Sequence, residues 1–232
     1  MTHYRLALLL PSLLSLSGCP QPPPPATVDM TMAGCTTPFQ GDPSQPIQLE
    51  IIYVDQSANT VALSECSDVE IVKPPQGGRV VFAGVRATNI DPCYAKLIGV
   101  LRAPDGSISG SGPDNRTVTL VPIAGRPGWV QSDPSGDLQN AGYAGFANLP
   151  LCPNYDPNDV QDRIARIEMT IKDRGDRTAV KSVTVVPRCR ATDPTDEAQC
   201  YCLCSGNYTS DRCTDLKGWD AGSPKPICGD MK

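Results

Sequence analysis

The amino-acid sequence predicts an all-β fold, from its composition and from the spacing of its apolar runs. Of 232 residues, 20 are glycine and 24 are proline, while aromatic residues make up only 5%. Short runs rich in β-branched residues alternate with clusters of turn-forming residues, as in two packed sheets. We see no 3.6-residue apolar repeat over a dozen residues, which disfavours helices. We therefore expect an immunoglobulin-like β-sandwich over residues 47–187.

The expected strands are the apolar runs at residues 47–55, 79–88, 95–104, 117–124, 165–173 and 178–186. In the fifth run, Ile167, Met169 and Ile171 alternate with polar residues, which predicts one buried and one solvent-facing side. The sequence "DRGD" (173–176) follows, so the last two runs are expected to form a hairpin whose glycine supplies the turn conformation. In the run 79–87, odd-numbered and even-numbered residues are both apolar, which predicts a central strand.

The chain contains 11 cysteines, which indicates disulfides formed outside the reducing cytosol. Because the number is odd, one cysteine is left outside the intramolecular bridges. The disulfide candidates are the ten that follow Cys19, namely Cys35, Cys66, Cys93, Cys152, Cys189, Cys200, Cys202, Cys204, Cys213 and Cys228. We expect Cys93 to be bonded to Cys152. The last six cysteines, an even number, predict a tail over residues 188–232 with its own bridges and a boundary near Arg188.

The first residues of the chain predict export. The apolar run over residues 6–18 is interrupted by Pro11 and Ser12, and it is too short to span a bilayer. A signal peptide at residues 1–18 fits better. The sequence Leu16-Ser17-Gly18-Cys19 resembles the lipobox of bacterial lipoproteins. The resemblance implies that Cys19 becomes the first residue, with diacylglycerol on its thiol and a further acyl chain, such as palmitate, on its amine.

Residues 19–46 are expected to be the lipidated cysteine and its tether. The run "PQPPPP" (20–25) favours an extended polyproline helix, a semi-rigid spacer of about 3.1 Å per residue. Pro20 stands where many Gram-negative lipoproteins retained in the inner membrane have aspartate. The resemblance therefore implies a cell-envelope protein of the outer membrane. Lipidation of Cys19 would also leave an even number of cysteines for disulfides.

The tail contains a second resemblance. In "CLCSGNYTSDRC", the residues Cys202, Cys204, Tyr208 and Cys213 resemble the end of an EGF-like module, with its C-x-C-x8-C spacing. The resemblance implies a small unit that depends on its bridges, since it has little apolar bulk.

Catalytic chemistry is limited by the scarcity of histidine. The only histidine is His3, in the segment expected to be removed, which excludes Ser-His-Asp and Cys-His mechanisms and histidine-bound zinc. The chain has no S-x-x-K motif to support a serine nucleophile with a lysine base. We expect no catalytic residue, no cofactor and no metal site.

Two segments contain residue types that bind metals, but we do not interpret either of them as a metal site. The C-x-C spacing of Cys202 and Cys204 differs from the C-x2-C of zinc sites, and disulfides are favoured outside the cytosol. The loop 155–162 places acidic and amide side chains close together, which suits calcium. It lacks the glycine and terminal glutamate of an EF-hand loop, so we interpret it as a solvated loop. The residues concerned are Asp156, Asn158, Asp159 and Asp162.

The sequence yields one functional hypothesis and one alternative. The net charge of −5 and the absence of a basic cluster beside aromatic residues argue against nucleic acid as a partner. The tripeptide Arg174-Gly175-Asp176 occurs in integrin ligands, but we interpret it as a hairpin turn. We expect a lipid-anchored envelope protein with a non-catalytic binding or structural module, whose partner is an envelope protein or a polysaccharide. The alternative is an envelope hydrolase with paired carboxylates, acting for example on a polysaccharide.

Overall fold

The computed structural model describes residues 34–103, 105–108, 112–136, 143–153 and 159–216. Residues 1–34 and residues 35–232 form separate compact units. The expected signal peptide, Cys19 and the proline run lie outside the described residues. The second unit begins at Cys35, so it takes in both the end of the expected tether and the cysteine-rich tail.

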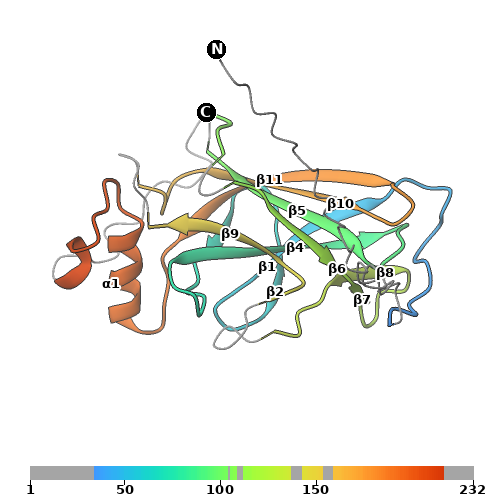
Figure 1. The fold of residues 1–232 in the computed structure, drawn as a ribbon, viewed down its shortest axis with the longest axis horizontal. Coiled ribbons are helices and arrows are strands. Elements are labelled where there is room, and N and C mark those ends of the chain that lie inside the picture. The colour runs from blue at the N-terminus through green and yellow to red at the C-terminus, as the bar shows by residue number, and fades with distance from the viewer. Residues whose placement is uncertain (1–33, 104, 109–111, 137–142, 154–158, 217–232) are drawn as a thin grey trace, which may run out of the picture. The chain divides into compact units, whose positions relative to one another are not determined.

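Two β-sheets pack against each other, which confirms the all-β prediction (Figure 1). The strands of the six-stranded sheet are β1 (Gln48–Val54), β2 (Thr60–Ala62), β4 (Arg79–Thr88), β7 (Leu120–Pro122), β8 (Trp129–Ser132) and β9 (Ala147–Cys152). Their order is β2-β1-β4-β8-β7, and β9 also pairs with β4. The strands of the five-stranded sheet are β3 (Ser67–Glu70), β5 (Ala95–Arg102), β6 (Asp114–Val118), β10 (Ala165–Lys172) and β11 (Thr178–Arg188). Their order is β3-β11-β10-β5-β6.

The hairpin of β10 and β11 forms as the alternating pattern predicts. The two strands pair antiparallel from Ala165↔Val185 to Lys172↔Thr178, and the apolar side chains of β10 point into the core. The turn differs in one respect, because the positive φ of +62° belongs to Asp176 and not to Gly175. Aspartate tolerates this left-handed conformation better than most residues do. The expected role of the glycine was therefore wrong.

The strand β4 is central, as predicted from its apolar residues at odd-numbered and even-numbered positions alike. It pairs with β1, β8 and β9, and it buries side chains on both faces of its sheet. Val81 and Val85 face the five-stranded sheet, while Phe82 belongs to a second apolar cluster on the opposite face. There, Phe146 lies so close to Gly84 that a Cβ atom at this position would be 2.6 Å from its ring. A glycine is needed at residue 84 for Phe146 to cover the sheet.

The sequence reasoning missed several short strands and one helix, α1 (Pro194–Leu203). Asp193 caps this helix by accepting a hydrogen bond from the amide of Thr195 at 2.9 Å, and Pro194 occupies its first turn. Asp196 and Glu197 add favourable negative charge near the helix N-terminus. The sequence "DPTDE" (193–197) carried this signal. In the described part of the chain, no helix has the length and apolar character needed to cross a membrane.

Candidate functional site at the disulfide junction

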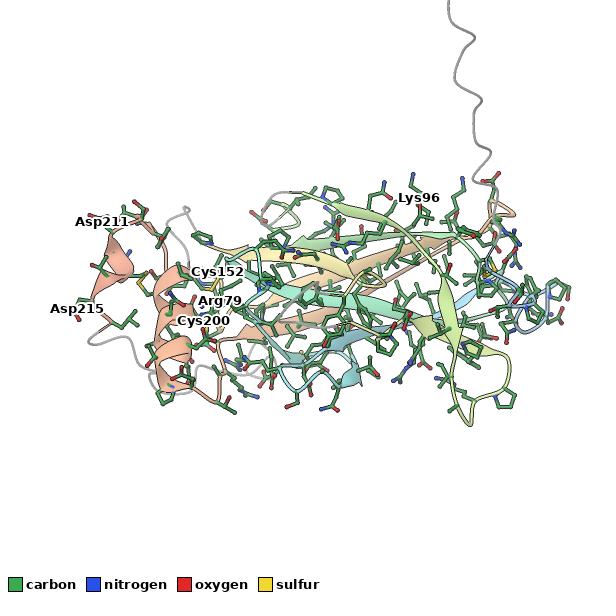
Figure 2. The ribbon with its side chains drawn as sticks, turned by 60° about the horizontal axis from the view of Figure 1, so that its bottom comes forward. Arg79, Lys96, Cys152, Cys200, Asp211 and Asp215 are labelled. Atoms are coloured by element: carbon green, nitrogen blue, oxygen red, sulfur yellow. A yellow bond between two sulfur atoms is a disulfide. The ribbon has the colours of Figure 1, made fainter. Side chains whose placement is uncertain are left out.

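The helix α1 docks on the end of the sandwich where β9 and β11 finish (Figure 2). Cys152, the last residue of β9, is bonded to Cys204, the C-cap of α1. Cys189, just after β11, is bonded to Cys200 within α1. Cys200 and Cys204 are four residues apart, so both sulfur atoms lie on the same side of the helix. The sulfur atoms of Cys189, Cys200 and Cys204 lie within 4.8 Å of one another. We call this region the disulfide junction, with residues Arg79, Cys152, Cys189, Asp196, Cys200 and Cys204.

The bridges of the disulfide junction are part of the main hydrophobic core. Cys152, Cys189, Cys200 and Cys204 are all buried and pack within the same apolar cluster as the inner faces of both sheets. The Cys152–Cys204 bridge spans 52 residues of sequence. In the chain-entropy treatment, a crosslink of that span stabilises the folded state by about 4 kcal/mol. The junction therefore joins the tail firmly to the sandwich.

Arg79 provides a polar contact at the same place. It is the first residue of β4, and its side chain is only 1% exposed. Its guanidinium group donates to both carboxylate oxygens of Asp196, at 2.9 and 2.7 Å, and to the backbone oxygen of Asp196 at 3.0 Å. Such a two-point contact is stronger and more directional than a single hydrogen bond. It holds the first turn of α1 at a defined position against β4.

The electrostatics of this contact favour the ionised pair. Hydrogen bonds from Arg79 hold the pKa of Asp196 below its ordinary value, although partial burial of the carboxyl opposes them. Gln199 accepts from Arg79 at 3.3 Å, and the Nζ atom of Lys73 lies 3.8 Å from the same carboxylate. The Nε atom of Arg79 is buried without a hydrogen-bond partner among the described residues. The arrangement is suited to holding the helix in place, since its charged groups are occupied by one another.

Two expectations about the disulfides were wrong. Cys93 is bonded to Cys35 rather than to Cys152. Cys152 is bonded to Cys204, so the bridges of the tail are not self-contained. The expected pairing assumed that the ends of β5 and β9 meet, whereas Cys152 points to the end of the sandwich where α1 docks. Within the tail, Cys189–Cys200 and Cys202–Cys213 are local bridges of 11 residues each.

The remaining cysteines are Cys19, Cys66 and Cys228. Cys66 precedes β3, is partly exposed, and lies outside the four bridges of the described residues. Cys19 and Cys228 lie outside the described residues. The resemblance of residues 202–213 to an EGF-like module stays a prediction. In this segment, Cys202 lies within α1 and is bonded to Cys213.

The sulfur atoms at the disulfide junction are as close together as metal ligands are, but they are not in the thiolate form that binds a metal. Metal-binding cysteines act as thiolates, and each of these sulfur atoms is shared in a disulfide. The geometry is therefore that of two adjacent structural bridges.

The acidic loop considered for calcium is partly described. Asp156 and Asn158 lie outside the described residues. Asp159 accepts a hydrogen bond from the amide of Gly206 at 2.7 Å. Asp162 forms an ion pair with Arg188. Both described carboxylates thus have contacts within the protein that stabilise the tail and the end of β11.

The tripeptide at residues 174–176 is held by ion pairs on both sides. A guanidinium nitrogen of Arg174 lies 2.6 Å from Asp91, and the carboxylate of Asp176 lies 2.8 Å from Lys172. These contacts fix the hairpin turn, which supports the interpretation of the tripeptide as a turn.

The carboxylate of Glu50 is held by a cation. Glu50 makes a two-point contact with Arg126, at 2.6 and 2.8 Å, and Arg126 stacks on Trp129 with 3.5 Å from its Cζ atom to the ring centre. The hydrogen bonds from Arg126 lower the pKa of Glu50. A general acid at neutral pH needs a raised pKa. Side-chain hydrogen bonds likewise lower the pKa values of Asp42, Asp105, Asp176 and Asp196.

Protein families and curated proteins provide no relative of this chain. No family model matches the chain, and no curated protein matches it. Function must therefore be argued from the residues themselves. The sequence reasoning missed Arg79 and Asp196, whose only signals were a charged residue opening an apolar run and a helix-starting motif.

Proposed function

We propose that this protein is a lipid-anchored component of a bacterial cell envelope, attached through Cys19, with a non-catalytic binding or structural module on a proline-rich tether. The observation that carries the proposal is the set of four disulfides, which join Cys35, Cys93, Cys152, Cys189, Cys200, Cys202, Cys204 and Cys213. Several structural disulfides in one chain form and persist outside the reducing cytosol. They support export, and the lipobox resemblance supports anchoring.

The number of cysteines supports lipidation independently of the motif. Four bridges use eight of the 11 cysteines and leave Cys19, Cys66 and Cys228. If Cys19 carries a diacylglycerol group, Cys66 and Cys228 remain as partners for each other. One acyl chain holds a protein weakly, whereas the two or three chains of a bacterial lipoprotein hold it stably.

The module itself has the properties of a scaffold. Its two sheets enclose an apolar core, and at the disulfide junction the guanidinium group of Arg79 is paired with the carboxylate of Asp196. We propose an immunoglobulin-like class for this sandwich, supported by the packing of two largely antiparallel sheets. The outer membrane remains our proposed location, on the basis of Pro20.

Metabolic labelling with a fatty-acid analogue tests the anchor. The wild type and the control variant Cys66→Ala are expected to be labelled and to sediment with membranes. Cys19→Ala is expected to lose both label and tight membrane association. Equal labelling of Cys19→Ala and the wild type contradicts the proposal.

Titration of free thiols tests two points together: export to an oxidising compartment, and the pairing of Cys66 with Cys228 that lipidation of Cys19 would leave. The denatured, unreduced mature protein is expected to show almost no free thiol, and Cys66→Ala is expected to release one. Four reactive thiols in the wild type would contradict export to an oxidising compartment.

A further inference from the structure

The outer face of the five-stranded sheet places like charges side by side. The antiparallel register of β10 and β5 sets Lys172 directly beside Lys96, and Arg166 directly beside Arg102. These residues alternate with the buried side chains of their strands, so they lie on the face that points away from the core. We call Lys96, Arg102, Arg166 and Lys172 the cationic face. In Figure 2, Lys96 extends outward from the sandwich.

Directly opposed like charges destabilise a sheet, because their Cβ atoms are only about 5 Å apart. The fold relieves this repulsion in part. Arg102 lies 3.1 Å from Glu168, and Lys172 lies 2.8 Å from Asp176. Lys96 and Arg166 are exposed, and neither has an ion pair with another described residue. Two cations therefore remain without an internal partner on a chain whose net charge is −5.

Two rows of side chains separate the two cation pairs on this face. One row contains Ile98, Thr170 and Val180, and the other contains Val100, Glu168 and Ser182, side by side on β5, β10 and β11. Val180 is 60% exposed. Arg166 and Lys172 are six residues apart, so the two cation pairs are separated by about 20 Å along the strands. These rows contain no aromatic side chain among the described residues, so they offer no platform for stacking a sugar ring.

The outer face of the six-stranded sheet carries a cluster of aromatic side chains. On the six-stranded sheet, Phe82 packs edge-on against Tyr143, which packs in the same way against Phe146, with ring centres 5.4 and 5.8 Å apart. This cluster covers part of the sheet with the protein's own chain. The five-stranded sheet instead presents its outer face to the solvent through Lys96, Arg166 and Val180.

We propose that the cationic face docks on anionic lipid headgroups of the membrane that holds the chain. This proposal builds on the proposed lipid anchor. A sheet face with exposed cations complements the negatively charged surface of a bilayer, and each lysine or arginine near an anionic membrane improves binding about fivefold. At about 3.1 Å per residue, an extended stretch with the number of residues between Cys19 and Gly34 can span about 50 Å, which would let the face meet the same bilayer. Because the anchor keeps the local concentration high, weak affinity is sufficient.

Vesicle binding without the anchor tests the docking surface. Residues 20–232, which retain every described residue, are purified with their disulfides formed and are sedimented with phosphatidylcholine vesicles, with or without phosphatidylglycerol. We expect binding only when phosphatidylglycerol is present, and a steep loss as salt rises. The double variant Lys96→Glu/Arg166→Glu is expected to bind at least about twenty-five-fold more weakly, at about fivefold for each cation lost.

The control variant is Arg86→Glu/Lys181→Glu, which has the same change in net charge. Arg86 lies on β4 of the other sheet, and Lys181 alternates with Val180, so it points away from the cationic face. We expect the control to keep most of the binding. Circular dichroism checks that both variants are folded.

Three results overturn the proposal. They are equal binding to both kinds of vesicle, an equal loss in the control variant, and binding to soluble polygalacturonate in the absence of vesicle binding, which would assign the face to an anionic polysaccharide. None of them affects the labelling of Cys19, and a failure of labelling leaves the vesicle result unchanged. The two proposals therefore fail separately.

Discussion

The two ends of the sandwich are held by different means. At the helix end, two buried disulfides and a nearly inaccessible arginine join α1 to three other segments of the chain. At the hairpin end, where β10 turns into β11, one disulfide is accompanied by ion pairs of Arg174 and Arg177 that remain about one-third exposed on the arginine side. Asp173, the partner of Arg177, is buried, but the Arg174–Asp91 pair is exposed enough to be screened by water, and the hairpin end has one bridge where the helix end has two. The helix end should therefore contribute more to stability.

The largest expected effect is the loss of the Cys152–Cys204 bridge. The variant Cys152→Ala/Cys204→Ala should lose about 5 kcal/mol of unfolding free energy, about 4 from chain entropy and about 1 from the cavity left in the core. The matched variant Cys35→Ala/Cys93→Ala removes a bridge that spans 58 residues. Because Cys35 is partly exposed, its loss leaves less of a cavity, and we expect a loss of about 4 kcal/mol of unfolding free energy. Urea unfolding measures both. A larger loss at Cys35 and Cys93 would reverse the comparison.

The next effect concerns the ion pair at the helix end. Asp196→Ala leaves the buried guanidinium group of Arg79 without its carboxylate, and we expect a loss of about 2 to 3 kcal/mol. Glu197→Ala removes a neighbouring charge from the same helical turn, so it measures the effect of the helix dipole alone, about 0.5 kcal/mol. Both are measured by urea unfolding at pH 7. Equal losses would show that the contact with Arg79 contributes little.

A smaller effect is expected from pH. Because the pKa of folded Asp196 is lowered, its ion pair stabilises the protein above the ordinary pKa of 3.8, and this stabilisation disappears as the pH falls through the folded value. The stability difference between the wild type and Asp196→Asn should thus be constant from about pH 5 to 7 and shrink below about pH 4. At the hairpin end, a hydrogen bond from Lys172 also lowers the pKa of Asp176, but this side chain is 83% exposed. Asp176→Asn should show little of the same dependence in thermal unfolding between pH 2 and 7, and a dependence as strong as that of Asp196→Asn would contradict the comparison.

The smallest effect is expected at the hairpin turn. Arg174→Ala removes an ion pair with Asp91 whose arginine is 39% exposed, and the expected loss is under about 1 kcal/mol. Added salt should reduce the difference from the wild type further. A loss as large as that of Asp196→Ala would show that the exposed network at the hairpin end is as important as the buried contact.

Five of the six expected strands could be predicted because their signal is local, whereas the expected strand 117–124 is divided between β6 and β7, which belong to different sheets. The alternation of Ile167, Met169 and Ile171 with polar residues requires a strand with one buried side, whichever strand becomes its neighbour. The helix α1 also had a local signal in Asp193 and Pro194, which an emphasis on strands overlooked. The short strand β3 lacked such a signal, because four residues paired in parallel with β11 depend on their partner for their conformation.

The disulfide junction could not be predicted, since it depends on which segments meet. The number of cysteines indicated bridges, but ten cysteines allow hundreds of pairings, and the one proposed for Cys93 was wrong. Similarly, the paired cations at Lys96 and Lys172 lie 76 positions apart in the sequence and become neighbours only through the register of β5 and β10.

The sequence by itself determined the class of fold, the strands with strong alternation, the expectation of export, and the residue types available for chemistry. These follow from composition and from periodicity over a few residues, where backbone geometry alone decides which side chains share a face. Only the tertiary structure decided the partners of Cys93 and Cys152, the burial of Arg79 against Asp196, and the rows of the cationic face. Each of these depends on strand order, register and the docking of α1, which arise from packing between segments that are distant in the chain.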